Sequence, residues 1–520
     1  YDMPVSAFTK YNLLDGSIRN NVAFEEKRTI AVQVPTWHPE NCIQCGICSY
    51  VCPHATIRPF LLTDEEVANA PMEFETIGAM GKGVENLKYR IQVSPANCVG
   101  CGLCAVECPG KAGNKALEMV DINEKLDEEP LADYLFKHTE YKSNYFSTDT
   151  VKGSQFLMPY FEVSGSCPGC GETPYYKLVS QLFGRDMLVA NATGCSMIYC
   201  SSTPSTPFVN DKNGEGVAWA NSLFEDNAEF GYGMALAQNY KEAHILKVME
   251  DNMETVEPAL KEAFAKYIEV HGNREAEREV APTIKELAAK SDIAEVKELA
   301  DLDLISKSIW IVGGDGWAYD IGYGGLDHVL ANNLNVNVLV LDTEVYSNTG
   351  GQSSKSSQAA SIAKFAAGGK TTAKKDLGQI AMAYGHVYVA SIAMGANKNQ
   401  TLKAIKEAEA YDGPSLILAY SPCAEHGIKG GLSNHQKTQA KAVECGYVDL
   451  YRYNPDLEQP LTIDSKEPDY DKMLDFMMSE TRFSQLPKLK GETAYEMFEK
   501  TKKDAMKRHR RLKALAEEKI

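Results

Sequence analysis

The sequence predicts a smaller cysteine-rich α+β domain followed by a larger, doubly wound α/β domain. Two cysteine-rich blocks lie between residues 42 and 108. Beyond residue 300, short apolar runs without polar alternation are interleaved with helical patterns. Such runs are typical of strands buried on both faces of a parallel sheet, and their alternation with helices indicates an α/β fold. The chain of 520 residues is long enough for two or three domains.

Composition excludes several classes of function. The net charge of −18 argues against a nucleic-acid partner and against an anionic membrane surface. No apolar run reaches the roughly 18 residues of a membrane span, and no signal segment opens the chain. The 14 cysteines occur largely as CxxC pairs, which indicates metal binding in a reducing, cytoplasmic compartment. Because the first residue is Tyr1, we expect a processed product, a subunit or a piece of a longer chain.

We expect three regions along the chain. Residues 1–36 form an extended lead-in segment, residues 37–145 form a cysteine-rich domain with an insert at 53–97, and residues 146–520 form the α/β domain. The large domain carries a helical excursion at 253–303, and a basic amphipathic helix at 492–519 is expected to dock on this domain or on a partner.

The expected strands and helices of the large domain follow from apolar patterning. The expected strands are 308–312, 336–341, 386–389 and 415–419. The clearest helices between them are expected at 376–384 and 399–411.

Each cysteine block has the pattern C-x2-C-x2-C-x3-C-P, the spacing of bacterial two-cluster ferredoxins. The fourth cysteine of each run crosses to the other cluster in that arrangement. One cluster is therefore assigned to Cys42, Cys45, Cys48 and Cys108, and the other to Cys98, Cys101, Cys104 and Cys52. The alternative is zinc in four-cysteine sites, but these usually consist of two CxxC pairs separated by a longer loop. Two neighbouring clusters would conduct electrons.

Further cysteines in the large domain are candidate ligands of a third cluster. Cys167 and Cys170 form a CPGC motif, and Cys195 and Cys423 are each expected to lie in a loop where the chain turns. Cys200 competes with Cys195 for this role, whereas Cys445 follows a helical stretch and is expected to be a buried core thiol. Three clusters would then use twelve of the fourteen cysteines.

Two polar loops follow neighbouring strands of the predicted sheet. The first is the segment GGDGW, which ends at Trp317, and the second is the segment DTEVYSNTGG, which starts at Asp342. One strand–helix–strand unit separates them, so they should meet where α/β sheets bind ligands. Asp315, Thr343 and the carbonyl of Val345 supply oxygens suited to a magnesium diphosphate. The alternative is an ordinary βα turn beside a polar loop.

Together these motifs resemble the C-terminal half of the pyruvate:ferredoxin (flavodoxin) oxidoreductase family. The resemblance is carried by the two ferredoxin blocks, CPGCGE, ATGCS, SPC, the GDG and DTEVYSNTGGQ loops, and WANSLFEDNAEFGYGM at 219–234. It covers essentially the whole chain. It implies a thiamine diphosphate-binding α/β domain preceded by a ferredoxin-like domain with two 4Fe-4S clusters.

The resemblance also implies roles for individual residues. Cys167, Cys170, Cys195 and Cys423 would bind the cluster proximal to thiamine, while Glu172 and Cys195 would lie against the cofactor. Asp315, Thr343 and Val345 would bind Mg²⁺, and Asn348 would reach the substrate carbonyl as a catalytic residue. The expected cofactor-lining residues are Gly314, Asp315, Gly316, Trp317, Thr343, Glu344, Val345, Tyr346, Ser347 and Asn348.

The implied reaction is the oxidative decarboxylation of pyruvate with coenzyme A to acetyl-CoA and CO2. Electrons would pass through three 4Fe-4S clusters to ferredoxin or flavodoxin. The glutamate that activates thiamine lies in the family's N-terminal half, so we expect this chain to need that half or companion subunits, and to form a homo-oligomer. Lys82, Lys88, Arg90 and Lys111 could form a docking patch for an acidic acceptor, but solvated loop charges are the favoured interpretation.

Alternatives remain at this stage. A related 2-oxoacid:ferredoxin oxidoreductase would act on 2-oxoglutarate, on a branched-chain or aryl 2-oxoacid, or on oxalate. An electron-transfer protein with a decayed thiamine domain would bind no thiamine diphosphate. A zinc scaffold would contain neither iron nor labile sulfide.

Overall fold

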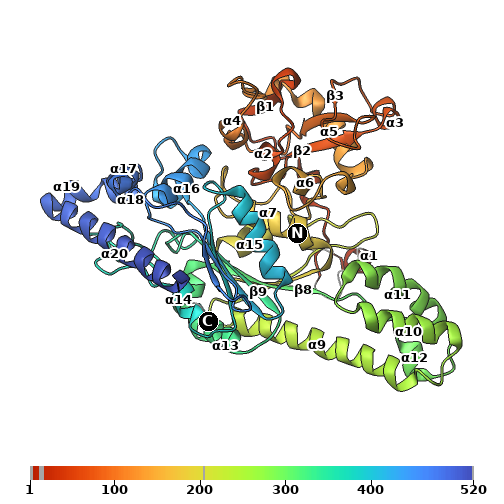
Figure 1. The fold of residues 1–520 in the computed structure, drawn as a ribbon. Coiled ribbons are helices and arrows are strands. Elements are labelled where there is room, and N and C mark those ends of the chain that lie inside the picture. The colour runs from red at the N-terminus through yellow and green to blue at the C-terminus, as the bar shows by residue number, and fades with distance from the viewer. Residues whose placement is uncertain (1–3, 11–16, 203–204, 518–520) are drawn as a thin grey trace.

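The computed structural model describes residues 4–10, 17–202 and 205–517. Figure 1 shows a small N-terminal unit, in red and orange, stacked on a larger unit built around one sheet. Helices α9 to α12 project as an arm from one end of the sheet (Figure 1). No helix among the described residues is both long enough and apolar enough to cross a membrane.

The small unit contains two antiparallel sheets. Strand β1 pairs with β5, and β4 lies between β2 and β3. The strands are β1 (Gln33–Trp37), β2 (Ile57–Leu62), β3 (Ile77–Gly78), β4 (Lys88–Val93) and β5 (Leu117–Asp121). The helices are α2 (Ile47–Tyr50), α3 (Asp64–Ala68), α4 (Leu103–Glu107) and α5 (Glu129–His138), with α1 (Val5–Lys10) before them and α6 (Val151–Ser154) after them. Strand β1 therefore crosses the boundary expected at residue 36.

Helices α2 and α4 each begin within a cysteine block, directly after a glycine. Gly46 and Gly102 have φ angles of 74° and 73°, in the left-handed region that favours glycine. This turn lets the chain reverse between the second and third cysteines of each block. The two blocks therefore have the same local geometry.

The large unit is built on an eight-stranded sheet in the order β13-β12-β10-β11-β9-β8-β6-β7. The six strands from β10 to β7 are parallel, and β12 and β13 add an antiparallel edge. The parallel strands are β6 (Met187–Ala192), β7 (Ala218–Ser222), β8 (Ser308–Gly314), β9 (Val336–Asp342), β10 (Tyr388–Ile392) and β11 (Pro414–Tyr420). The edge strands are β12 (Tyr451–Tyr453) and β13 (Leu461–Ile463).

The four strands expected from sequence are present, although β10 begins two residues later than expected. Patterning missed β6, β7, β12 and β13. The apolar run of strand β6 is interrupted by a polar residue, Asn191. In the folded chain this side chain is buried and forms hydrogen bonds with Tyr176 and Ser196. The edge strands β12 and β13 are three residues each, too short for a pattern to be recognised.

Successive residues of the sheet pack on opposite faces. Trp310 and Val312 of β8 join one core cluster with α7 and α15, whereas Ile309 and Ile311 join another with α9, α13, α14 and α20. The helices named here are α7 (Thr173–Phe183), α9 (Asn227–Asn252), α13 (Tyr323–Ala331), α14 (Leu377–Met382), α15 (Lys398–Ala410) and α20 (Glu492–Glu517). The remaining helices are α8 (Cys195–Cys200), α10 (Pro258–Val270), α11 (Arg274–Ala288), α12 (Ala294–Glu298), α16 (His435–Glu444), α17 (Met473–Met478), α18 (Thr481–Ser484) and α19 (Leu486–Lys490).

The helical arm is longer than the excursion expected at 253–303, because it already starts with α9 at Asn227. Helices α10 to α12 bury an apolar cluster of their own against the end of α9. The C-terminal helix α20 packs on the sheet through Leu512, and its Arg508 and His509 bond Asp449 at 3.0 and 2.7 Å. It therefore docks on its own domain.

The small unit is joined to the large one by a shared core. Tyr50 and Leu103, from the two cysteine blocks, belong to the same apolar cluster as α7 and α15. The Tyr50 hydroxyl donates to the carbonyl of Lys398 at 3.0 Å, and Lys398 pairs with Glu107 at 3.3 Å. The cysteine blocks are thereby held over one face of the sheet.

Candidate cluster and cofactor site

The first cysteine set lines one cavity in the small unit. Cys42, Cys45 and Cys48 of the first block and Cys108 of the second surround it, with Trp37 and Tyr89 among the apolar walls. All fourteen cysteines, which all lie in the described part of the chain, are free thiols. Among the described residues, no group of three or more such side chains converges on the position of a single metal ion, and four thiols that line one cavity fit a polynuclear iron–sulfur cluster.

The second set lines a separate cavity. It consists of Cys98, Cys101 and Cys104 of the second block and Cys52 of the first. Burial raises the pKa of Cys98 to about 12 and that of Cys101 to about 11. The structure thus brings together the two crossed sets that the block spacing predicts; that each thiol binds iron stays a prediction.

The three cysteine sets lie in a defined order. The backbone of Gly169, in the CPGC loop, lies against the thiol of Cys101 in the second set. Cys104 of the second set in turn lies near Cys48 of the first set. The second set is therefore between the CPGC loop and the first set.

The third set is assembled from three distant segments. Burial, and then the nearby charge of Glu172, raise the pKa of Cys195, and the neighbouring thiols of Cys170, Cys423 and Cys167 add to this shift. The sequence suggested that Cys195 lies in a loop, but it is the first residue of α8. Cys200, the competing candidate, ends the same helix and is fully buried against Tyr176. Cys445 is a buried core thiol, as expected, beside Met473.

Glu172 lies at the start of α7, next to this third set. Burial raises the pKa of its carboxyl to about 7, although the neighbouring Tyr199 hydroxyl opposes the shift. Its Oε2 has no hydrogen-bond partner among the described residues. A buried carboxyl oxygen without a partner costs free energy, so this atom is suited to accept a hydrogen bond from a bound group.

The two polar loops meet at the carboxyl ends of β8 and β9. Asp315 is 1% exposed, and its Oδ1 accepts a hydrogen bond from the Thr343 hydroxyl at 3.0 Å. The Thr343 Oγ1 also lies 2.9 Å from the carbonyl oxygen of Val345 and 2.8 Å from the Ser347 hydroxyl. The Thr343 hydroxyl therefore contacts both of the other oxygens expected to hold Mg²⁺. Burial, and then the charge of Asp342, raise the pKa of Asp315 to about 8.

The other expected cofactor-lining residues differ in their surroundings. Trp317 is fully buried, and the Tyr346 ring packs so closely on Gly316 that a side chain there would clash. Gly314 borders open space, since an added Cβ would meet only the Leu341 carbonyl at 3.9 Å. Asn348 is exposed on its loop. Their contact with a cofactor stays a prediction.

Glu344 has a different environment from the one expected of a cofactor-lining residue. Its carboxylate is fully buried and accepts hydrogen bonds from Lys374 at 3.0 Å and from Tyr447 at 2.5 Å, and it pairs with Arg482 at 2.9 Å. Burial alone would raise its pKa, but Lys374 and Arg482 outweigh burial and lower it to about 2. Glu344 thus fastens its loop to the domain. No local motif marks this network, because its members are far apart in sequence.

His426 connects the two parts of the site and was not expected from sequence. Its Nε2 donates to the carbonyl of Thr343 at 2.6 Å, and its Nδ1 accepts from the backbone N–H of Cys423 at 3.4 Å. Burial and the nearby Arg482 lower its pKa to about 3, so the ring is neutral. The thiol of Cys423 also donates to the Ser347 hydroxyl at 3.4 Å. The sequence signal that could have indicated His426 is its position three residues after Cys423.

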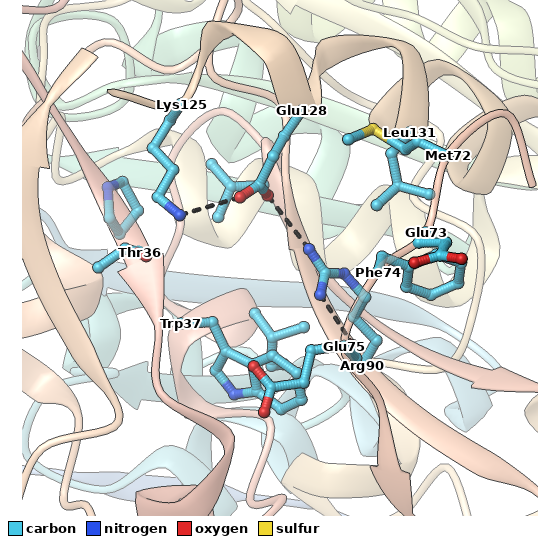
Figure 2. Close-up of a pocket in the computed structure, with 13 residues that line it drawn as sticks. Thr36, Trp37, Met72, Glu73, Phe74, Glu75, Arg90, Lys125, Glu128 and Leu131 are labelled. Carbon is cyan, nitrogen blue, oxygen red and sulfur yellow. Dashed lines mark hydrogen bonds and ion pairs between the residues drawn. The ribbon is translucent and has the colours of Figure 1, made fainter. Parts of the chain in front are cut away.

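One of the four residues considered for a basic docking patch, Arg90, is not at the surface. Arg90 lines a pocket of about 250 Å³. Figure 2 shows its guanidinium bonded to Glu128 and to the backbone of Glu75. Arg90 is buried, and Lys88 pairs with Asp64 at 2.9 Å. Lys82 and Lys111 are exposed. Arg90 is therefore withdrawn from the surface, whereas Lys82 and Lys111 are open to an acidic partner.

The fold and the site together define a class of protein, one that joins a thiamine diphosphate domain to a two-cluster ferredoxin domain. Residues 296–419 match the family described as thiamine pyrophosphate enzyme, C-terminal TPP binding domain. Residues 38–114 match the 4Fe-4S dicluster domain. The chain therefore contains both domains and has the means to bind thiamine diphosphate and 4Fe-4S clusters.

Particular relatives share nearly the whole chain. The pyruvate:ferredoxin oxidoreductase of Moorella thermoacetica is 52% identical over 99% of this chain, which corresponds to 44% of that protein. The pyruvate-flavodoxin oxidoreductase of Klebsiella pneumoniae is 46% identical, with the same shares of 99% and 44%. The chain is thus homologous to these oxidoreductases and spans less than half of their length. A solved 2-oxoglutarate:ferredoxin oxidoreductase from Magnetococcus marinus matches 50% of this chain and 64% of that one, with a TM-score of 0.30 and 17% identity.

Proposed function

We propose that this chain is the electron-transfer and thiamine-binding part of an enzyme that oxidises pyruvate with coenzyme A to acetyl-CoA and CO2. One observation carries the proposal. Cys195, Asp315, Thr343 and Cys423 follow β6, β8, β9 and β11, four strands that lie side by side in the sheet. The proximal cysteine set and the diphosphate loops therefore share one edge of the sheet, where open α/β sheets bind ligands.

In this proposal the two loops hold the diphosphate end of the cofactor. Asp315, Thr343 and the Val345 carbonyl would supply oxygens to Mg²⁺, which prefers such ligands. Thiamine diphosphate, when bound, supplies the electron sink for decarboxylation of a 2-oxoacid. Glu172, with its unpartnered Oε2, would accept a hydrogen bond from the cofactor, and Asn348 would approach the substrate carbonyl.

The order of the three cysteine sets supports an electron path. Cys167, Cys170, Cys195 and Cys423 would hold the proximal cluster, because Cys423 contacts the Ser347 hydroxyl of the cofactor loop. The set around Cys101 would follow, and the set around Cys45 would pass electrons to ferredoxin or flavodoxin. Iron–sulfur clusters carry one electron at a time, which suits such acceptors. Exposed Lys82 and Lys111 would assist docking of an acidic acceptor.

We further infer that the remaining part of the enzyme supplies the activating glutamate and most contacts to pyruvate and coenzyme A. It would be an N-terminal half or companion subunits in a cytoplasmic homo-oligomer. The chain alone would then bind thiamine diphosphate but turn over no pyruvate.

The test compares the cluster-loaded chain with the whole native gene product, under anaerobic conditions. We expect acetyl-CoA formation and ferredoxin reduction from pyruvate only with the whole protein. Robust turnover by the 520-residue chain alone would contradict the need for another half. A faster rate with 2-oxoglutarate, a branched-chain or an aryl 2-oxoacid would overturn the choice of pyruvate.

A further inference from the structure

Lys177 is a buried lysine beside two of the cysteine sets. It lies in α7, the helix that begins just after Cys170 and Glu172, and it is only 1% exposed. A buried ammonium group is costly unless opposite charge compensates it. The function proposed above gives this residue no role.

The ammonium group of Lys177 reaches into the small unit, between the two cysteine sets. It donates to the carbonyl oxygen of Ser49 and, at 3.1 Å, to that of Tyr50. Ser49 directly follows Cys48, a member of the first set. The same Ser49 carbonyl accepts the backbone N–H of Cys52, a member of the second set, at 3.2 Å. The Ser49 carbonyl thus links Lys177 to one member of each set, through the peptide bond to Cys48 and the hydrogen bond to Cys52.

The charges around Lys177 differ from those around its buried neighbour Arg58. Arg58 pairs with the carboxylate of Glu162 and donates to the Tyr141 hydroxyl at 2.7 Å. Burial lowers the pKa of Lys177 to about 8 and the charge of Arg58 adds to this shift, whereas the thiols of Cys52 and Cys48 oppose it. Its natural counter-charge is therefore the pair of clusters that these thiols would help to bind.

We propose that the positive charge of Lys177 raises the reduction potentials of both ferredoxin-type clusters. Four thiolates give each cluster a net negative charge, and reduction adds one more. A fixed cation in a water-poor environment stabilises the reduced form more than the oxidised form. Lys177 thus makes both clusters easier to reduce and favours electron flow away from the proximal cluster. This role depends on the electron path proposed above, but its test requires neither pyruvate nor coenzyme A.

The experiment is a redox titration of the cluster-loaded chain, monitored by electron paramagnetic resonance. K177Q removes the charge and keeps a hydrogen-bond donor, whereas K177R keeps the charge. At a fixed potential we expect K177Q to lower the ratio of reduced to oxidised cluster about tenfold for both clusters. For a one-electron couple, this corresponds to a decrease of about 59 mV in the reduction potential. We expect K177R to stay within about threefold of the wild type, and the proximal cluster to shift less.

Lys152 offers a matched control. Its Nζ donates to the Met80 carbonyl at 2.7 Å and lies near Cys42 and Cys45, but the residue is half-exposed. Solvent and salt screen such a charge, so K152Q should change the ratio less than threefold. K177M is measured as well, so that a folding defect specific to glutamine does not decide the result.

Unchanged potentials in K177Q and K177M at full iron content would overturn the proposal. Equal shifts in K177Q and K177R would also overturn it, because packing rather than charge would then be responsible. Loss of iron from both neutral variants, with retention in K177R, would support the proposal, because the clusters would then require the charge. Loss of iron from all three variants would count against it.

Discussion

The two ferredoxin-type cysteine sets and the third set differ in how the chain assembles them. The eight cysteines of the first two sets lie in two short blocks, and within each block a glycine with positive φ shapes the turn. The third set combines the CPGC loop with Cys195 and Cys423, which enter from the ends of β6 and β11. Local spacing specifies the first kind of site, whereas the second kind exists only once the parallel sheet has formed. Variants should therefore affect the two kinds of site differently.

The largest effect is expected from Cys423→Ala, which removes a ligand contributed by a distant strand. We expect iron to fall from about twelve atoms per chain toward about eight, with the ferredoxin-type signals retained. Cys445→Ala is the control, since this buried thiol contacts Met473 and belongs to none of the sets. The measurement is iron and labile sulfide per chain. An unchanged iron content in C423A would show that Cys423 is not a ligand of the third cluster.

Cys108→Ala tests the crossing between the two blocks. Because Cys108 lines the cavity of the first block, its loss should damage the cluster of Cys42, Cys45 and Cys48 and spare that of the second block. Cys52→Ala should have the reciprocal effect. Electron paramagnetic resonance of the reduced chain distinguishes the two clusters. Damage confined to the cluster of the block that carries the mutation would refute the crossed assignment.

Asp315→Asn acts on the diphosphate loops. Because it removes a carboxylate charge from the expected magnesium site, we expect affinity for thiamine diphosphate with Mg²⁺ to fall by at least about 100-fold, as measured by calorimetry. Iron content should not change, since Asp315 contacts Thr343 and Ser354 and no cysteine. Asp303→Asn is the control, because this residue pairs with Lys307 at 2.7 Å, just before the opposite end of β8. Equal affinities of D315N and wild type would exclude Asp315 from the site.

His426→Ala separates the cofactor loop from the third cysteine set. It leaves the Thr343 carbonyl and the Cys423 N–H without the His426 side chain as a partner, so we expect the free energy of unfolding to fall by about 2 kcal/mol. Thiamine diphosphate affinity should fall about tenfold, the size of effect typical for residues behind metal ligands. His426→Gln should recover part of both losses, because glutamine both donates and accepts. Wild-type affinity in H426A would show that the link has no effect on binding.

The smallest effect is expected at the docked helix α20, which contributes no residue to any of the cysteine sets. The hydrogen bond from His509 to Asp449 raises the pKa of His509 above its ordinary value of 6.5. The folded chain therefore binds this proton more tightly than the unfolded chain, so the contribution is full below pH 6.5 and is lost as pH rises through the folded pKa. His509→Gln should cost no more than about 1 kcal/mol at pH 6 and less at pH 8. Thermal unfolding at both pH values checks this, and an equal loss at both would contradict it.

The sequence predicted structure best where the relevant pattern lies within a short segment. Four buried strands and the cysteine blocks were visible, because apolar runs and ligand spacing are properties of short segments. Strand β6 was missed because Asn191 interrupts its apolar run and satisfies its polar atoms only in the folded state. Arg90 was expected at the surface, yet Glu128 and the Glu75 carbonyl hold it in a pocket. Hydrogen bonds between distant residues leave no periodic trace in the sequence.

The sequence by itself determined the ligand types, the ferredoxin spacing and the two loops rich in oxygen donors, because each is encoded within a few neighbouring residues. Only the tertiary structure decided that Cys195 and Cys423 join Asp315 and Thr343 along one sheet edge, that His426 bridges two loops, and that Lys177 is buried between two cysteine sets. The physical reason is that the order of parallel strands follows from how helices and strands pack on both faces of the sheet. That packing brings together side chains that are hundreds of residues apart.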